Sequence, residues 1–160
     1  MKKGFTLIEI ILVIAVGVIL LAVGALSLTG LRSARTLETE TQQLVAVLQA
    51  SQEKAAGQDM GSRWGVYFDI TAERNAYFLF QVDEDLQATP EYGDIPGAIL
   101  DSHTLSPGLT LVLENGVTSS LIFAKGTGRP TAAATITVTS GSEETAKNVI
   151  ITAQGRISYE

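Results

Sequence analysis

Residues 3–28 read KGFTLIEIILVIAVGVILLAVGALSL, and this stretch decides how the chain is organised. Every residue from Ile10 to Leu26 is apolar or glycine, and Glu9 is the only charged residue between Phe5 and Leu28. A helix needs about 20 apolar residues to cross the hydrocarbon core of a bilayer. We therefore predict a membrane-spanning helix over residues 5–28.

Basic residues flank this stretch on both sides, with Lys2 and Lys3 before it and Arg32 and Arg35 after it. Basic flanks favour the cytoplasmic face of a membrane. Because a short amino end holds its lysines in the cytoplasm more easily than it crosses the bilayer, we predict a cytoplasmic N-terminus. The remainder of the chain is then expected on the periplasmic side of an inner membrane.

Two simpler interpretations of the apolar run are a secretory signal peptide, cut near Ala22-Val23-Gly24, and a plain signal anchor. Neither of them explains a carboxylate placed early in the span. A charge at the centre of a bilayer costs about 2.5–3.5 kcal/mol or more, so Glu9 calls for a partner.

A cut between Gly4 and Phe5 would supply that partner, because it creates an α-ammonium group at Phe5. Glu9 follows four residues later, which is about 6 Å along a helix axis. That spacing suits a pairing of Glu9 on one chain with the new amino group of a neighbouring chain, offset by one turn.

The run Lys3-Gly4-Phe5-Thr6-Leu7-Ile8-Glu9 resembles the class III-type signal of type IV pilins and type II secretion pseudopilins. The resemblance implies that residues 1–4 are a leader removed after Gly4 by a prepilin peptidase, which also N-methylates Phe5. It further implies that Glu9 recruits the subunit into a filament. The implied partners are the peptidase and N-methyltransferase, other pilins or pseudopilins, and an inner-membrane assembly platform.

Residues 29–58 are expected to continue the same helix in amphipathic form, giving one helix from about Phe5 to about Gln58. The chain has no proline before this end, and Gly57 or Gly61 is suited to close the helix. The predicted buried stripe consists of Ala34, Leu37, Thr41, Leu44, Val45, Leu48 and Ala55.

Residues 59–160 change to a period of two with frequent turn residues, which predicts a β-rich globular domain. We expect about seven antiparallel strands, with a hairpin at Asn115-Gly116 joining residues 109–114 to 117–123. The expected fold class is α+β: a pilin-like fold with one long N-terminal helix packed on an antiparallel β-sheet domain. The other strands are predicted at residues 66–69, 76–82, 134–139, 148–152 and 156–159.

Residues 120–126, SLIFAKG, and residues 149–157, VIITAQGRI, resemble two segments of the H-type minor pseudopilins and their pilus-associated relatives. This resemblance implies a minor pseudopilin of a type II secretion system, a structural subunit for protein secretion. A minor type IV pilus subunit for adhesion, twitching or DNA uptake is the first alternative. A membrane-anchored periplasmic binding module that does not polymerise is the second.

No residue pattern indicates an enzyme or a cofactor. Residues 126–129 carry glycines but lack the ending of a phosphate loop, so we predict a turn there. His103 is the one histidine and is interpreted as a loop residue. The acidic residues 83–94 have the spacing of a calcium-binding loop and offer weak candidate ligands. The sixth residue of this segment is alanine rather than glycine, which favours a solvated acidic loop. The candidate ligands are Asp83, Asp85, Gln87, Glu91 and Asp94.

The part of the chain from Thr29 onward carries nine Lys or Arg and sixteen Asp or Glu, a formal charge of −7. Nucleic-acid binding is usually served by a basic surface, so we expect no nucleic-acid partner. The chain has no cysteine, so its fold contains no disulfide bond.

Overall fold

The computed structural model describes residues 6–71, 75–82, 99–115, 119–141 and 145–160, apart from the side chains of residues 23–31. The chain divides into two units, residues 1–35 and 36–160, which are described separately.

One long helix, α1 (Leu7–Ala56), begins the described chain, close to the predicted bounds. The residue that takes the left-handed conformation beyond its end is Gln58 (φ 55°), so the prediction of a closing glycine is wrong. Local side-chain contacts hold this turn: Lys54 pairs with Asp59 at 2.9 Å, and the Trp64 indole N–H donates to the Asp59 carbonyl oxygen. Gly61 (φ 69°) instead ends the short 3-10 helix η1 (Asp59–Gly61).

The β-domain contains two four-stranded antiparallel sheets within its described residues, in place of the seven strands expected. The first sheet has the order β3-β2-β1-β5 and the second has the order β4-β6-β7-β8. The strands of the first sheet are β1 (Arg63–Ile70), β2 (Asn75–Val82), β3 (Ile99–Thr104) and β5 (Ser120–Phe123). Those of the second are β4 (Leu109–Glu114), β6 (Ala134–Ser140), β7 (Ala146–Ile151) and β8 (Ile157–Tyr159).

The hairpin predicted at Asn115-Gly116 is wrong. Asn115 does adopt a left-handed conformation (φ 54°), but β4 pairs with β6 while β5 pairs with β1. The turn residues predicted the pairing incorrectly, because the partner of a strand is set by long-range packing. At Gly65 on β1, an added Cβ would lie 2.8 Å from the Leu121 carbonyl oxygen, so this close β1–β5 approach requires glycine.

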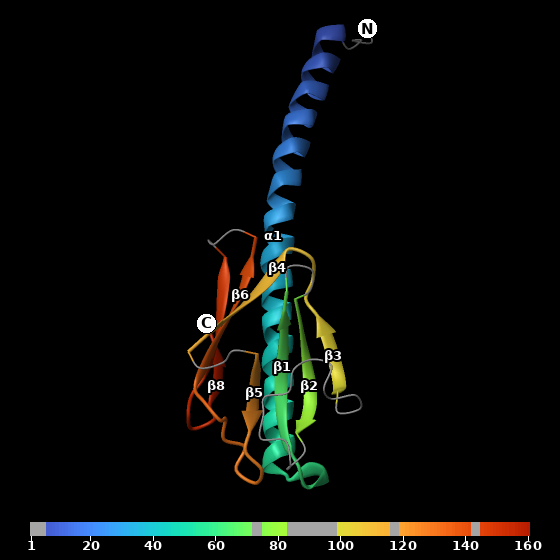
Figure 1. Ribbon diagram of the computed structural model, residues 1–160. Helices are drawn as coiled ribbons and strands as arrows, with labels where there is room; N and C mark the ends of the chain where they lie inside the picture. The colour runs from blue at the N-terminus through green and yellow to red at the C-terminus, as the bar shows by residue number, and fades with distance from the viewer. Residues whose placement is uncertain (1–5, 72–74, 83–98, 116–118, 142–144) are drawn as a thin grey trace. The chain divides into compact units, whose positions relative to one another are not determined.

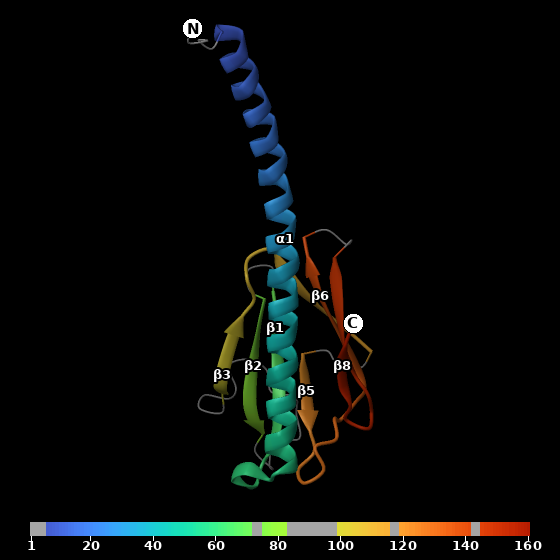
Figure 2. The same ribbon diagram turned by 180° about the vertical axis from the view of Figure 1, so that it is seen from behind.

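The carboxyl-terminal half of α1 packs on both sheets of the β-domain. In Figures 1 and 2 it lies along β1, with β2 and β3 to one side and β6 and β8 to the other. One apolar core joins Leu44 and Leu48 of the helix to Trp64 and Phe123 of the first sheet and Ile136 of the second. The predicted fold, a long helix packed on an antiparallel β-sheet domain, is therefore confirmed.

The predicted helical stripe is confirmed from Leu37 to Ala55, whereas Ala34 is exposed. Two polar residues that the stripe did not include, Glu40 and Ser51, are also buried. A buried carboxylate is rare in a protein core unless it is paired or hydrogen-bonded, so Glu40 requires partners.

Candidate functional site

The predicted processing junction, Gly4 and Phe5, lies outside the described residues, and so does the acidic segment that contains Asp83, Asp85, Gln87, Glu91 and Asp94. Among the described residues, no group of three or more His, Cys, Asp or Glu side chains is arranged to hold a metal ion. The calcium site and the processing site therefore stay sequence predictions.

Glu9 lies in the first turn of α1, which begins with the Glu9 amide donating to the Thr6 carbonyl oxygen at 3.1 Å. A carboxylate in this turn is favourable, because the amino end of a helix carries partial positive charge. Its side chain is exposed and borders an apolar groove that is otherwise lined by Ile10, Val13 and Ile14. The predicted assembly residue thus stands beside exposed apolar side chains of the same helix.

Apart from Glu9, the side chains of residues 7–22 form an apolar helix surface. Leu7 and Leu21 are each 76% exposed, and an added Cβ at Gly17 would meet nothing within 4 Å. Apolar surface of this extent is costly in water and marks a site of membrane or protein contact.

Within the described residues, no helix contains an apolar stretch long enough to span a bilayer. The span predicted over residues 5–28 includes Phe5 and the undescribed side chains from residue 23 onward, so it stays a prediction.

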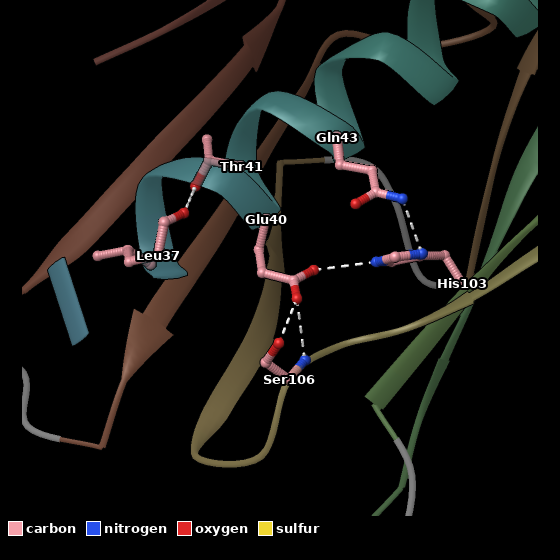
Figure 3. Close-up of polar contacts among 6 residues, drawn as sticks. All are labelled: Leu37, Glu40, Thr41, Gln43, His103 and Ser106. Carbon is pink, nitrogen blue, oxygen red and sulfur yellow. Dashed lines mark hydrogen bonds and ion pairs between the residues drawn. The ribbon is translucent and has the colours of Figure 1, made fainter. Parts of the chain in front are cut away.

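The buried carboxylate of Glu40 is the centre of a polar cluster that the sequence analysis missed (Figure 3). The amide and the hydroxyl of Ser106 both donate to Oε1, and Nε2 of His103 lies 3.0 Å from Oε2. On the other side of the imidazole ring, Nδ1 lies 2.9 Å from the Gln43 amide nitrogen. These hydrogen bonds connect β3 and the turn that follows it to α1.

The interpretation of His103 as a loop residue is wrong, because His103 lies on β3, paired with Tyr77 of β2. The strand was missed because it is an edge strand whose residues are mostly exposed and polar. The ring centroids of Tyr77 and His103 are 5.1 Å apart, and burial, with the Glu40 and Asp101 carboxylates, raises the pKa of Tyr77. The Tyr77 hydroxyl is buried and has no hydrogen-bond partner among the described residues.

Hydrogen bonds stabilise the ionised form of Glu40. Burial raises the pKa of this carboxyl, but hydrogen bonds from Ser106 and His103 outweigh the effect and hold the pKa below its ordinary value of 4.5. Replacing Glu40 would leave the donors of Ser106 and His103 without this acceptor at a partly buried position.

We expect Glu40→Ala to lower the free energy of unfolding by about 2 kcal/mol, since a hydrogen bond to a charged group contributes about 1.5–3 kcal/mol. Denaturation of the full chain in detergent, followed by fluorescence of Trp64, the single tryptophan, measures this. Glu53→Ala, at an exposed glutamate of the same helix, should change stability little. Because the folded-state pKa of Glu40 is lowered, the difference between wild type and Glu40→Ala should be full above pH 4.5 and shrink as the pH falls below it. An equal effect of the two variants would contradict this role.

Gln52 on α1 contacts two loops, one at Gly128, just after the segment 120–126, and one at Gly155, within the segment 149–157. The Gln52 amide donates to the carbonyl oxygens of Gly128 (3.0 Å) and Gly155 (2.7 Å). Gly128 (φ 62°) and Gly155 (φ 91°) both adopt left-handed conformations, and an added Cβ at either would lie within 3.1 Å of Gln52. Residues 126–129 thus form the predicted turn, and we call this contact the Gln52 clamp.

Comparison with known proteins matches both parts of the chain. A family profile described as "Prokaryotic N-terminal methylation motif" matches residues 1–25. The minor pseudopilin EpsH of the Vibrio cholerae type 2 secretion system is similar in structure, with 19% identity and a TM-score of 0.57, over 78% of this chain and 95% of that one. The chain joins a pilin-type methylation motif to a pilin-like fold. The predicted resemblance to type IV pilin-like proteins is thereby confirmed.

A second similar structure is the type IV minor pilin FimU of Pseudomonas aeruginosa, with 17% identity and a TM-score of 0.60, over 78% of this chain and 87% of that one. A search of curated protein sequences finds no match. Both structural neighbours are pilin subunits rather than enzymes, but at this identity they establish the fold alone.

Proposed function

We propose that this pilin-like chain is a minor pseudopilin, a non-enzymatic subunit of the pseudopilus of a type II secretion system. The observation that carries the proposal is the coincidence of a methylation motif over residues 1–25 with a pilin-like fold. A short motif recurs by chance and a fold can serve several functions, but the two features point to the same class of protein.

In this proposal the apolar amino-terminal helix has two successive environments. It first anchors the chain in the inner membrane, and after removal of residues 1–4 it packs against the helices of other pilins or pseudopilins. Glu9 is the carboxylate that meets the methylated amino group of a neighbouring Phe5. The exposed apolar surface of α1 and the groove beside Glu9 support this role, since both need a partner to cover them.

The test is amino-terminal sequencing and intact mass of the protein purified from its native membrane. A chain that starts at N-methyl-Phe5 supports a processed filament subunit. A chain that starts at Met1 is instead an anchored module that does not polymerise, and one that starts near Ala25 is an exported protein.

A minor type IV pilus subunit is the second candidate, because FimU is as similar in fold as EpsH is. Deletion of the gene in the source organism separates the two: loss of protein secretion supports the pseudopilin, and loss of twitching, adhesion or DNA uptake without a secretion defect supports the pilus subunit. The formal charge of −7 from Thr29 onward counts against direct capture of DNA by this chain.

A further inference from the structure

Two glutamates of α1, Glu38 and Glu40, each contact a different sheet of the β-domain. Glu40 binds β3 and Ser106, the latter in the turn after that strand (Figure 3). The Glu38 carboxylate accepts a hydrogen bond from the Tyr159 hydroxyl of β8 at 3.1 Å and lies 3.6 Å from the Lys147 ammonium group of β7. Because β3 and β8 are edge strands, the two carboxylates attach one edge of each sheet to the same helix, on opposite sides of it (Figures 1 and 2).

A glutamine one turn later supports each of these contacts. The Gln42 amide nitrogen donates to Glu38 Oε1 at 2.8 Å and lies 3.3 Å from the Tyr159 hydroxyl oxygen. The Gln43 amide nitrogen lies 2.9 Å from Nδ1 of His103, the residue that contacts Glu40. Both groups are therefore extended hydrogen-bond networks that have a carboxylate as their acceptor.

The edge strands depend on these polar contacts more than the central strands do. Neither β3 nor β8 contains a fully buried side chain, and Ile157 of β8 is only partly buried against the core. The central strands β2 and β6, in contrast, bury large side chains such as Phe80 and Ile136. Segments with few buried apolar contacts open at a lower cost than the rest of a domain. Loss of the carboxylate contacts should therefore loosen the two edges before the shared core opens.

Acid removes the negative charge of both carboxylates. Hydrogen bonds from Gln42 and Tyr159 hold the pKa of the Glu38 carboxyl below its ordinary value of 4.5. The pKa of the Glu40 carboxyl is lowered as well. A carboxyl whose pKa is lowered by folding contributes its full stability above the ordinary value and loses it as the pH falls below that value. Both attachments should therefore weaken together below pH 4.5.

Several other titratable groups face these carboxylates or lie near them. They are Lys147 of β7, Tyr159 of β8, His103 and Asp101 of β3, and Tyr77 of β2. A cation at Lys147 or His103 loses its ion-pair partner once the carboxyl beside it is neutral, which adds to the loosening. Because the pKa of Tyr77 is raised, its hydroxyl stays neutral in acid. The Asp101 carboxylate accepts from the Ser102 amide of its own strand.

We propose that Glu38 and Glu40 form an acid-sensitive attachment that releases the edge strands β3 and β8 from α1 while the apolar core stays closed. Leu37 and Leu44 of the same helical segment are buried in that core and do not titrate, so they keep the helix on the domain. The inference goes beyond the proposed function and does not depend on it, because every contact involved lies within residues 36–160 of one chain.

The test is hydrogen exchange of the full chain in detergent, read by mass spectrometry at about pH 6.5 and about pH 3.5 and corrected for the intrinsic pH dependence of amide exchange. In the wild type we expect acid to lower the protection of β3 about tenfold and that of β8 by less, while β1 and β6 stay protected. The larger effect is expected at β3, because Glu40 is buried whereas Glu38 is partly exposed.

The double variant Glu38→Gln/Glu40→Gln replaces both carboxylates by uncharged amides of similar size. It should show the acid pattern already at about pH 6.5 and change little on acidification, because no carboxylate is left to titrate. Glu40→Gln alone should loosen β3, and Glu38→Gln alone should loosen β8. Glu53→Gln, at an exposed glutamate of the same helix, should behave like the wild type.

Wild-type protection of β3 and β8 in the double variant at about pH 6.5 would overturn the inference, as would equal loosening of this variant and the wild type by acid. Loss of protection in β1 and β6 to the same extent as in β3 would also overturn it, since acid would then unfold the domain as a whole. These outcomes are independent of the amino-terminal sequencing that tests the proposed function.

Discussion

The Gly4→Leu variant is expected to reach the membrane with residues 1–4 still attached and with the unmethylated amino group of Met1. Glycine has no side chain, so it lets an enzyme approach the backbone at the bond that follows it, and a branched side chain there obstructs the approach. Intact mass and amino-terminal sequencing of membrane-purified protein measure the result. We expect loss of essentially all trimmed product, because the change is made at the residue that supplies the scissile carbonyl group.

Ile10→Leu is a suitable control, because it conserves volume and apolar character and leaves the junction unchanged. It should be trimmed and methylated like the wild type. Normal trimming of the Gly4→Leu precursor would show that residues 3–9 are not a class III signal, and the apolar run would then be a plain anchor or a signal of another kind.

Local periodicity predicted those parts of the fold that depend on neighbouring residues. The helix and the strands β1, β2, β6 and β7 follow from patterns that span a few turns or a few residues. The β4–β5 hairpin failed because Leu109–Glu114 and Ser120–Phe123 find their partners in different sheets. A period-two pattern indicates which face of a strand is buried, but it does not indicate which strand lies beside it.

The polar sites were harder to predict, because their partners lie far apart in the sequence. Glu40 stands three residues from Leu37 and four from Leu44, so its place on the buried face could have been noticed. Its partners, His103 and Ser106, could not have been predicted, because the strand that carries His103 was not recognised. The repeated Gly-Arg pairs at residues 128–129 and 155–156 were visible, but their meeting at Gln52 depends on the tertiary fold.

The Glu9→Val variant is expected to be trimmed after Gly4 but to fail in filament assembly and to lose most of its N-methylation. The junction is unchanged, and valine removes the cost of placing a carboxylate in a bilayer, so insertion and cleavage should proceed. Under the proposed function, the variant loses the carboxylate that pairs with the amino group created by cleavage of the neighbouring subunit. Removing one member of a buried ion pair costs about 3–5 kcal/mol, so we expect incorporation to fall on the order of a hundredfold or more.

Incorporation is measured by the amount of this chain in sheared filaments relative to the membrane pool, and methylation by intact mass. Val13→Ala is the matched control, because it alters the same groove without changing charge, and it should assemble close to the wild-type level. Normal incorporation of Glu9→Val would remove the pairing role while leaving cleavage at Gly4 intact. Together, the two variants test separate steps of the proposed assembly. Gly4→Leu should prevent the creation of the amino group at Phe5, and Glu9→Val should remove the carboxylate that pairs with this amino group. Only Glu9→Val should therefore yield a trimmed chain that stays in the membrane.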